Sequence, residues 1–228
     1  MIIMGIDEAG RGPLIGPMIL VGLRVDLKDI VFLEDLDIKD SKKLTKDKRE
    51  RLLPHIVEIA KHIIVAKISP KDIDSGNLNE ITYRAIGSII ESSCRTLGRC
   101  PDSIYIDSIG KPSTTRIKIN DMIRGIGKNI ELIIENKADE KYIVVGAASI
   151  VAKVLRDWEI DKISMHIGYF GSGYPSDPRT VEWLNNLDSK SLERARFFIR
   201  HKWSTYKRRS PHIISLDKYT FNGEALEQ

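Results

Sequence analysis

Short apolar runs alternate along the chain with longer stretches of helical periodicity, and this alternation predicts strands and helices in turn. Runs rich in Ile, Val and Leu predict strands over residues 1–7, 17–26, 62–68, 103–107 and 130–136. The 3.6-residue period predicts helices over about 46–61, 80–97, 142–166, 178–187 and 189–199. Strands that come first, with helices between and after them, are typical of an α/β fold in which helices flank a mixed sheet.

Local signals refine this outline. Thr45 is a plausible N-cap for the first helix, and Pro54 should kink or split that helix. Segments 69–79 and 169–178 are rich in Gly, Pro and Ser or in polar residues, and we expect loops there. A change of composition near residue 168 favours a main domain over 1–168 and a small C-terminal helical subdomain over 169–228.

Composition adds few constraints. A chain of 228 residues with 42% hydrophobic and 30% charged content fits a soluble globular protein with one good core. The apolar runs are far too short for a membrane span, and the start of the chain lacks the flanks of a signal peptide, so we expect a cytoplasmic protein. Cys94 and Cys100 have no histidine partners at zinc spacing, and we expect free thiols in a reducing cytosol.

Positive charge is concentrated near the C-terminus, although the net charge is only +4. Seven basic residues and no acid occur between Arg194 and Arg209: Arg194, Arg196, Arg200, Lys202, Lys207, Arg208 and Arg209. Aromatic residues lie among them, namely Phe197, Phe198, Trp203 and Tyr206. A charge run is often only a solvated surface, but the interleaved aromatics favour a surface that binds a polyanion.

Acidic residues recur where the predicted strands end. Asp7 and Glu8 end the first strand, Asp107 ends the fourth, and Asp139 follows the fifth by three residues. Crowded carboxylates repel unless a cation joins them, and Mg²⁺ or Mn²⁺ is the natural partner of such oxygen ligands. This arrangement suits two-metal phosphodiester hydrolysis. Each aspartate alone could instead be a turn residue or a helix cap. Adjacent strand residues face opposite ways, so Asp7 and Glu8 share a site only if the strand is already ending.

A glycine-rich turn follows these acids. Gly10 and Gly12 allow a tight turn whose backbone groups can approach a ligand closely. The dinucleotide-binding fingerprint is the competing interpretation, but GRGPLIG does not have the GxGxxG spacing, and Pro13 removes a donor.

Six blocks together resemble ribonuclease HII, the type 2 ribonuclease H, in its archaeal branch. They are GIDEAGRGP at 5–13, DSKKL at 40–44, YID at 105–107, KAD at 137–139, AASIVAKVLRD at 147–157 and GSGYPSDP at 171–178. The resemblance implies a ribonuclease H-like fold with a C-terminal helical subdomain that binds substrate. It also implies cleavage of the RNA strand of RNA–DNA hybrids, and incision 5′ of single ribonucleotides in duplex DNA to leave 3′-OH and 5′-phosphate ends.

The resemblance also implies roles for individual residues. The family's four catalytic, metal-binding acids fall on Asp7, Glu8, Asp107 and Asp139, and its motif that reads the ribose 2′-hydroxyl falls on Gly10, Arg11 and Gly12. The junction-sensing tyrosine falls on Tyr174. Further candidate substrate contacts are Lys43, Ser149, Lys153, Arg156 and Lys202.

Other possibilities remain open from the residues alone. A catalytically silent hybrid-binding module and a nucleotide-binding metabolic enzyme are the alternatives to a metal-dependent endoribonuclease.

The tail 215–221, SLDKYTF, loosely resembles the sliding-clamp binding peptide with which archaeal members often end. It lacks the usual glutamine and paired aromatics, so a frayed terminus is the default expectation. We expect a monomer.

Overall fold

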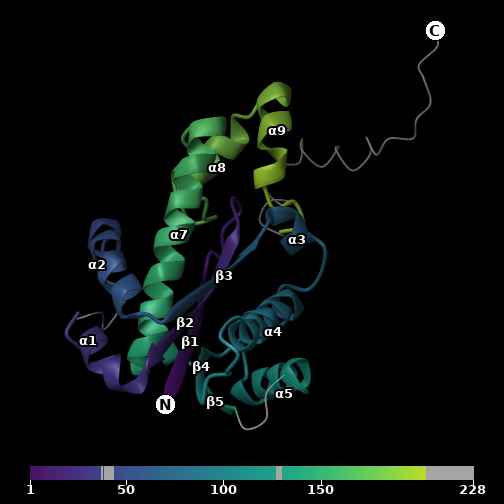
Figure 1. The fold of residues 1–228 in the computed structure, drawn as a ribbon. Helices are drawn as coiled ribbons and strands as arrows, with labels where there is room; N and C mark the ends of the chain where they lie inside the picture. Colours follow the sequence, from purple (N-terminus) through teal and green to yellow (C-terminus); the bar gives the residue numbers. More distant parts are fainter. Residues whose placement is uncertain (37, 39–43, 127–129, 204–228) are drawn as a thin grey trace.

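The computed structural model describes residues 1–36, 38, 44–126 and 130–203, and it contains one five-stranded mixed sheet in this part of the chain (Figure 1). The strands are β1 Ile2–Ala9, β2 Met18–Asp26, β3 His62–Ile68, β4 Ser103–Asp107 and β5 Glu131–Glu135. Their order across the sheet is β3-β2-β1-β4-β5. Strand β2 is antiparallel to its neighbours β1 and β3, whereas β1, β4 and β5 run parallel. All five predicted strands are confirmed.

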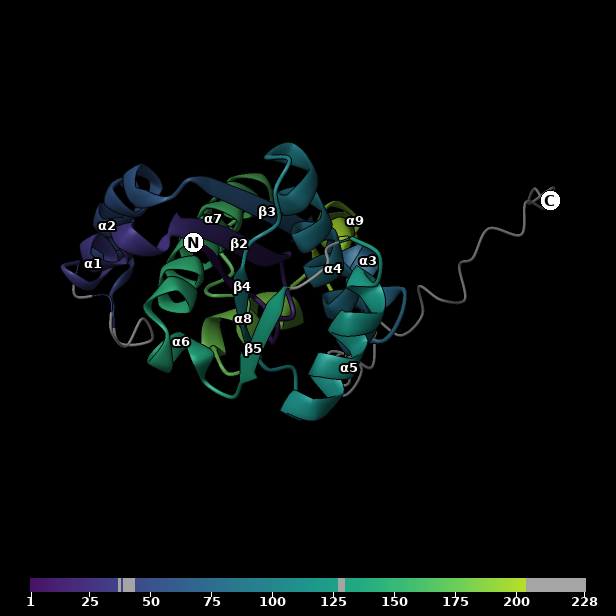
Figure 2. The same ribbon diagram turned by 60° about the horizontal axis from the view of Figure 1, so that its bottom comes forward.

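Helices cover both faces of the sheet. They are α1 Ile30–Glu34, α2 Lys46–Ile59, α3 Pro70–Asp74, α4 Leu78–Thr96, α5 Pro112–Ile123, α6 Ala138–Lys141, α7 Ile143–Ile167, α8 Pro178–Asn185 and α9 Ser189–Ala195. Short 3-10 turns occupy Leu27–Asp29 and Arg196–Phe198. Figures 1 and 2 show α7, α2 and α1 on one side of the sheet and α4 and α5 on the other, while α8 and α9 lie beyond the far end of the strands. No helix among the described residues is long and apolar enough to cross a membrane.

Three apolar clusters hold these layers together. The first lies between the sheet and α4–α5 and includes Met4 and Ile6 of β1; the second lies between the sheet and α7 and includes Ile3 and Ala9. The alternation of β1 side chains between the two clusters follows from the two-residue period of a strand. In the third cluster, Leu14 and Ile15 pack with residues of α7, α8 and α9. The turn after β1 is therefore held against the C-terminal helices.

The five predicted helices are confirmed, but the structure corrects other expectations. Segment 69–79, which we expected to be a loop, contains α3 and the start of α4, because Ser69 and Asp72 form a capping box and Pro70 occupies the first turn. Helix α5 and the short helices α1 and α6 were not predicted at all. Helix α2 does begin after the N-cap Thr45, but Pro54 does not split it. That proline lies on the exposed side, where water can satisfy the carbonyl that loses its partner.

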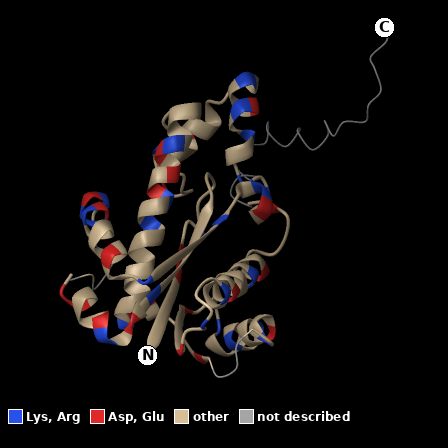
Figure 3. Cartoon of the chain, in the orientation of Figure 1, with Lys and Arg blue, Asp and Glu red and all other residues tan. Residues whose placement is uncertain are grey.

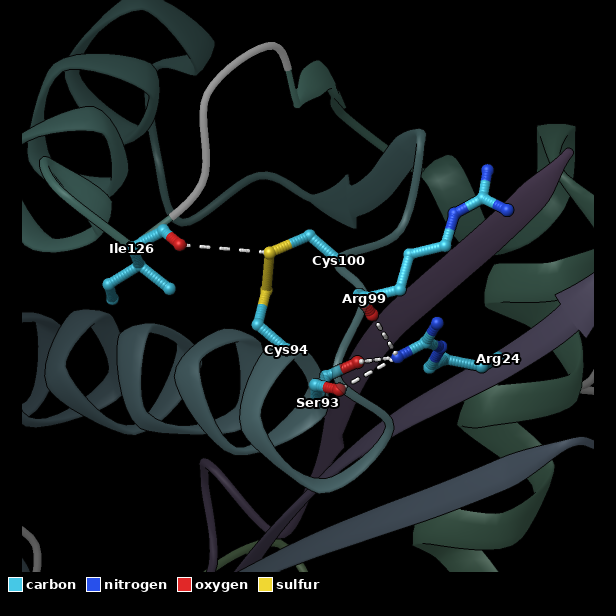
Figure 4. Close-up of a disulfide and its surroundings, with 6 residues drawn as sticks. All are labelled: Arg24, Ser93, Cys94, Arg99, Cys100 and Ile126. Atoms are coloured by element: carbon cyan, nitrogen blue, oxygen red, sulfur yellow. Dashed lines mark hydrogen bonds between the residues drawn. A yellow bond between two sulfur atoms is a disulfide. The ribbon is translucent and has the colours of Figure 1, made fainter.

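The expectation of free thiols was wrong, because Cys94 and Cys100 form a disulfide (Figure 4). Helix α4 ends between them, and the turn back toward β4 brings their Cα atoms to 4.2 Å. The fully buried Arg24 supports the same turn, since its Nη1 donates to the backbone oxygens of Ser93 at 2.7 Å and Arg99 at 3.0 Å. A charged donor and a covalent bond thus fix the end of α4.

Breaking this disulfide should lower the free energy of unfolding by about 2 kcal/mol, the loop-closure entropy of a ring this small. In a protein of this size that corresponds to about 5 °C in Tm, measured by calorimetry with and without dithiothreitol. A Cys94→Ala/Cys100→Ala variant should lose all sensitivity to the reductant. Titration of two free thiols in unfolded, unreduced protein would contradict the pairing.

Candidate active site

The two acids of β1 lie where the sheet ends. Parallel pairing of β1 with β4 stops at Ile6 and Ile106, so Asp7 and Asp107 come next on adjacent strands at the same edge. Strand β1 continues one residue beyond Glu8, to Ala9, and its last three residues pair only with β2. Strand β4, which lies next to β1, stops at Asp107. Both Asp7 and Glu8 interact electrostatically with Asp107.

Asp107 and Asp139 are placed by the turn that follows β5. Lys137 adopts a left-handed conformation, with φ of 58°, and reverses the chain into α6. The N–H of Ala138, the first residue of α6, donates to Asp107 Oδ1 at 3.0 Å. The N–H of Ser108 donates to the same oxygen at 3.2 Å. Asp139 lies in the first turn of α6 and is buried, with 6% of its surface exposed.

The carboxylates interact electrostatically in a poorly solvated place. Burial raises the pKa of Asp7 well above its usual range, and the neighbouring Glu8 raises it further, while a hydrogen bond with Ser149 opposes the shift. Burial also raises the pKa of Glu8, which Arg11 lowers and Asp107 and Asp139 raise. All four acids therefore belong to one electrostatic cluster, in which negative charge is costly without a cation.

The donor set of this cluster fits a hard divalent cation, because four carboxylates from three elements supply only oxygen ligands. Within the described ranges, no three His, Cys, Asp or Glu side chains stand at spacing ready for a metal ion. The carboxylates are thus neighbours in the fold that do not form a closed set of ligands.

Buried contacts fix the backbone of the turn that follows β1. Gly10 has a φ of +85°, and a Cβ there would lie 2.7 Å from the oxygen of Pro17. Arg200, fully buried, donates to the carbonyl oxygens of Gly10 at 2.6 Å and Arg11 at 3.0 Å. The Arg11 side chain turns away to Thr82 Oγ1 at 2.9 Å and to Asn79. The sequence placed Arg200 in a basic surface, but this residue stabilises the turn from within.

The loop at 171–177 lies against this turn. The carbonyl of Gly173 accepts from the N–H of Leu14 at 2.7 Å, which joins the two segments. A Cβ on Gly12 would lie 3.5 Å from Cε1 of Tyr174, so the ring faces the backbone of the turn. The N–H of Ser172 donates to Asp177 and holds the pKa of that carboxyl at about 2, so Asp177 stays ionised as the N-cap of α8.

Arg156 supports the loop from α7. Its guanidinium donates to the carbonyl of Ser172 at 2.7 Å and lies over the ring of Tyr174, with the guanidinium carbon 4.9 Å from the ring centroid. Only 6% of Arg156 is exposed, and its Nη1 is 3.7 Å from Asp157. The structure therefore places this predicted substrate contact beneath Tyr174, where it orients the ring.

The remaining predicted contacts are scattered. Ser149 is buried on α7 against Asp7, and Lys153 is half-buried one turn further along the same helix. Lys202 is exposed, and its N–H donates to Asp74 at 3.2 Å. Lys and Arg are prominent on α9 (Figure 3). Lys43, the basic residues after 203, and the tail 215–221 lie outside the described residues.

Comparison with known proteins gives one consistent family. The sequence model described as Ribonuclease HII matches residues 4–206. The ribonuclease HII of Sulfolobus acidocaldarius is 44% identical over 212 residues, which cover 93% of this chain and 96% of that relative. The crystal structure of the ribonuclease H2 from Pyrococcus horikoshii OT3 superposes with a TM-score of 0.80 at 37% identity, covering 92% and 98% of the two chains. The structure of the PCNA:RNase HII complex from Archaeoglobus fulgidus superposes with a TM-score of 0.76 at 36% identity. The match covers 89% of this chain and 95% of that chain.

Proposed function

Because the chain belongs to the ribonuclease HII family and is an endonuclease that hydrolyses the RNA strand of RNA–DNA hybrids, we propose that it also incises duplex DNA 5′ of a single embedded ribonucleotide. The products would carry 3′-OH and 5′-phosphate ends. The observation that carries this proposal is the contact between two segments far apart in the chain: the Gly10–Gly12 turn, which follows the acids directly, and the loop that bears Tyr174.

This juxtaposition suits the reading of a ribo-to-deoxyribo junction. A turn with little side-chain bulk lets backbone groups reach a 2′-hydroxyl, which is the group that distinguishes RNA from DNA at one nucleotide. The Tyr174 ring, oriented by Arg156, offers a flat surface on which the next deoxyribose can pack. An added 2′-hydroxyl on that sugar would fit poorly. The acids beside the turn then lie next to the phosphate that joins the two nucleotides.

We propose that Asp7, Glu8, Asp107 and Asp139 hold Mg²⁺ or Mn²⁺. When bound, such ions supply charge stabilisation and water activation for phosphodiester hydrolysis. The protein's part is to orient these carboxylates and to offer hydrogen bonds to two of them. Ser149 hydrogen-bonds to Asp7, and the N–H groups of Ser108 and Ala138 fix one oxygen of Asp107. The C-terminal subdomain, which the structure describes over residues 169–203, would bind substrate. Lys202 in it and Lys153 on α7 would contact backbone phosphates.

The decisive experiment uses a DNA duplex with one ribonucleotide, incubated with Mg²⁺ or Mn²⁺, and maps the product ends. A single cut 5′ of the ribonucleotide, abolished by EDTA, is expected. Cleavage confined to long RNA–DNA hybrids would refute the junction-reading part of the proposal and keep the family activity. An all-DNA duplex of the same sequence serves as the control and should stay intact.

Tyr174→Ala should reduce cleavage at a lone ribonucleotide by about tenfold to a hundredfold, and cleavage of a long hybrid by less. Stacking on an aromatic ring contributes about 1–3 kcal/mol, and only the junction substrate depends on it fully. Single-turnover rates on both substrates give the ratio. Tyr174→Phe keeps the ring and should behave almost as the unsubstituted protein. An equal loss on both substrates would remove Tyr174 from junction recognition.

A sliding clamp is a further proposed partner. The relative from Archaeoglobus fulgidus has been solved in a PCNA:RNase HII complex, which supports the same kind of partner here. We propose that the tail 215–221 makes this contact. Deletion of residues 210–228 should abolish co-elution with the clamp and leave cleavage of short duplexes unchanged. Retained co-elution would place the contact elsewhere.

A further inference from the structure

Arg200 lies at the centre of the turn formed by residues 10–16. Its Nη2 donates to the carbonyl oxygen of Gly10 at 2.6 Å and to that of Gly16 at 2.9 Å, and its Nε donates to Gly16 at 3.1 Å. Its Nη1 donates to the carbonyl of Arg11 at 3.0 Å. Since the side chain is fully buried, it cannot touch nucleic acid. Its planar fork instead joins both ends of the turn through their carbonyls.

These bonds fix the direction of two N–H groups. The C=O and N–H of a trans peptide point in opposite directions, and no cis peptide occurs in the described part of the chain. The carbonyls of Gly10 and Arg11 point inward to the guanidinium. The N–H groups of the same two peptides, which belong to Arg11 and Gly12, must therefore point outward.

Both outward N–H groups remain available. Neither donates a hydrogen bond to any group in the ranges that the structure describes. They follow Glu8 by a few residues, and Gly12 faces the ring of Tyr174. Two adjacent N–H groups that point the same way form a concavity that binds an oxygen acceptor. The acceptor offered at that place by a ribonucleotide-containing duplex is the 2′-oxygen or the adjoining phosphate.

We infer that Arg200 is a positioning residue for ribonucleotide recognition: by binding the carbonyls of Gly10, Arg11 and Gly16, it aims the N–H groups of Arg11 and Gly12 at the substrate. This role rests on the proposed function of the turn. Arg156 acts on the neighbouring loop, where it binds the carbonyl of Ser172 and orients Tyr174. A lysine at position 200 would keep the charge and lose the fork, so the carbonyls would no longer be fixed together.

The test measures binding without cleavage. Each variant is made in an Asp107→Asn background, and its affinity is measured for two duplexes of one sequence, with and without a single ribonucleotide. The ratio of the two affinities reports recognition of the 2′-hydroxyl. Arg200→Lys should lower this ratio about tenfold, the effect of losing one aligned hydrogen bond, and leave affinity for the all-DNA duplex unchanged. The matched control Arg124→Lys changes an exposed arginine at the end of the distant helix α5 and should alter neither value.

The outcomes distinguish recognition of the 2′-hydroxyl from the role of Arg200 in that recognition. A parent protein that binds both duplexes equally would refute 2′-hydroxyl reading, and the role of Arg200 would fall with it. A parent that discriminates, with an Arg200→Lys variant that is folded and discriminates equally well, would overturn the role of Arg200 alone. If Arg200→Lys does not fold, hydrogen exchange of the protein that keeps Arg200 decides. The amides of Arg11 and Gly12 should be protected by the ribonucleotide-containing duplex only, and equal protection by both duplexes would overturn the inference.

Discussion

Asp7→Asn is expected to fold normally and to lose about three orders of magnitude in kcat. Asparagine keeps the size of the side chain and can still accept the hydrogen bond of Ser149. It removes the negative charge that a divalent cation needs, and several kcal/mol of transition-state stabilisation corresponds to about a thousandfold in rate. Single-turnover cleavage of a hybrid substrate measures the loss.

In contrast to its activity, the stability of Asp7→Asn should not decrease. Folding raises the pKa of Asp7, so the folded state loses stability as pH rises through that raised pKa and the carboxyl ionises. A neutral amide avoids this loss. In EDTA at neutral pH, Asp7→Asn should therefore unfold at the same temperature as the parent protein or higher. The control Asp121→Asn, an exposed acid that pairs with Arg124, should change neither quantity. Near-normal turnover by Asp7→Asn would remove Asp7 from the site.

Much of the fold could be predicted because buried strands leave a clear apolar pattern. Four of the five strands and the long helix α7 follow from runs of Ile, Val, Leu and Ala that the structure buries in part or fully, whereas the edge strand β3 kept its apolar pattern with only Ile68 buried. Helix α5 escaped prediction because its pattern is weak: Ile117 is exposed, and only a few of its residues, such as Ile119 and Ile123, reach the core. The order of the strands could not be read locally, since it depends on which edges pair across the chain.

The site was partly predictable for a similar reason. Acids at strand ends are visible in the sequence, and parallel pairing of β1 with β4 brings Asp7 and Asp107 to one edge. Burial of individual arginines is not visible. Arg200 occurs in a basic run that looks like an exposed surface, yet the bridge between Ile15 and Ile199 draws it under the turn. The disulfide was missed because spacing alone does not show that the chain turns back between two cysteines.

Gly12→Ala should leave stability almost unchanged and abolish most activity. The added methyl group would lie 3.5 Å from Cε1 and 3.8 Å from Cδ1 of Tyr174, which is ordinary van der Waals contact, and position 12 does not have a left-handed φ. The free energy of unfolding should change by less than about 0.5 kcal/mol. The same methyl group lies beside the N–H of Gly12, where the proposed function places the ribose 2′-hydroxyl. A displacement of about 1 Å there can cost about a hundredfold in rate.

Two other glycines provide matched controls. Gly10→Ala combines a left-handed φ with a Cβ only 2.7 Å from the oxygen of Pro17, so it should lose about 1–3 kcal/mol of stability together with activity. Gly76→Ala lies in the open, with the nearest atom of Ile81 4.0 Å away, and should change neither. Thermal unfolding and single-turnover cleavage of all three variants distinguish the positions. Full activity of Gly12→Ala would show that the ribose 2′-hydroxyl does not approach the backbone at position 12, because an added methyl group would obstruct that approach.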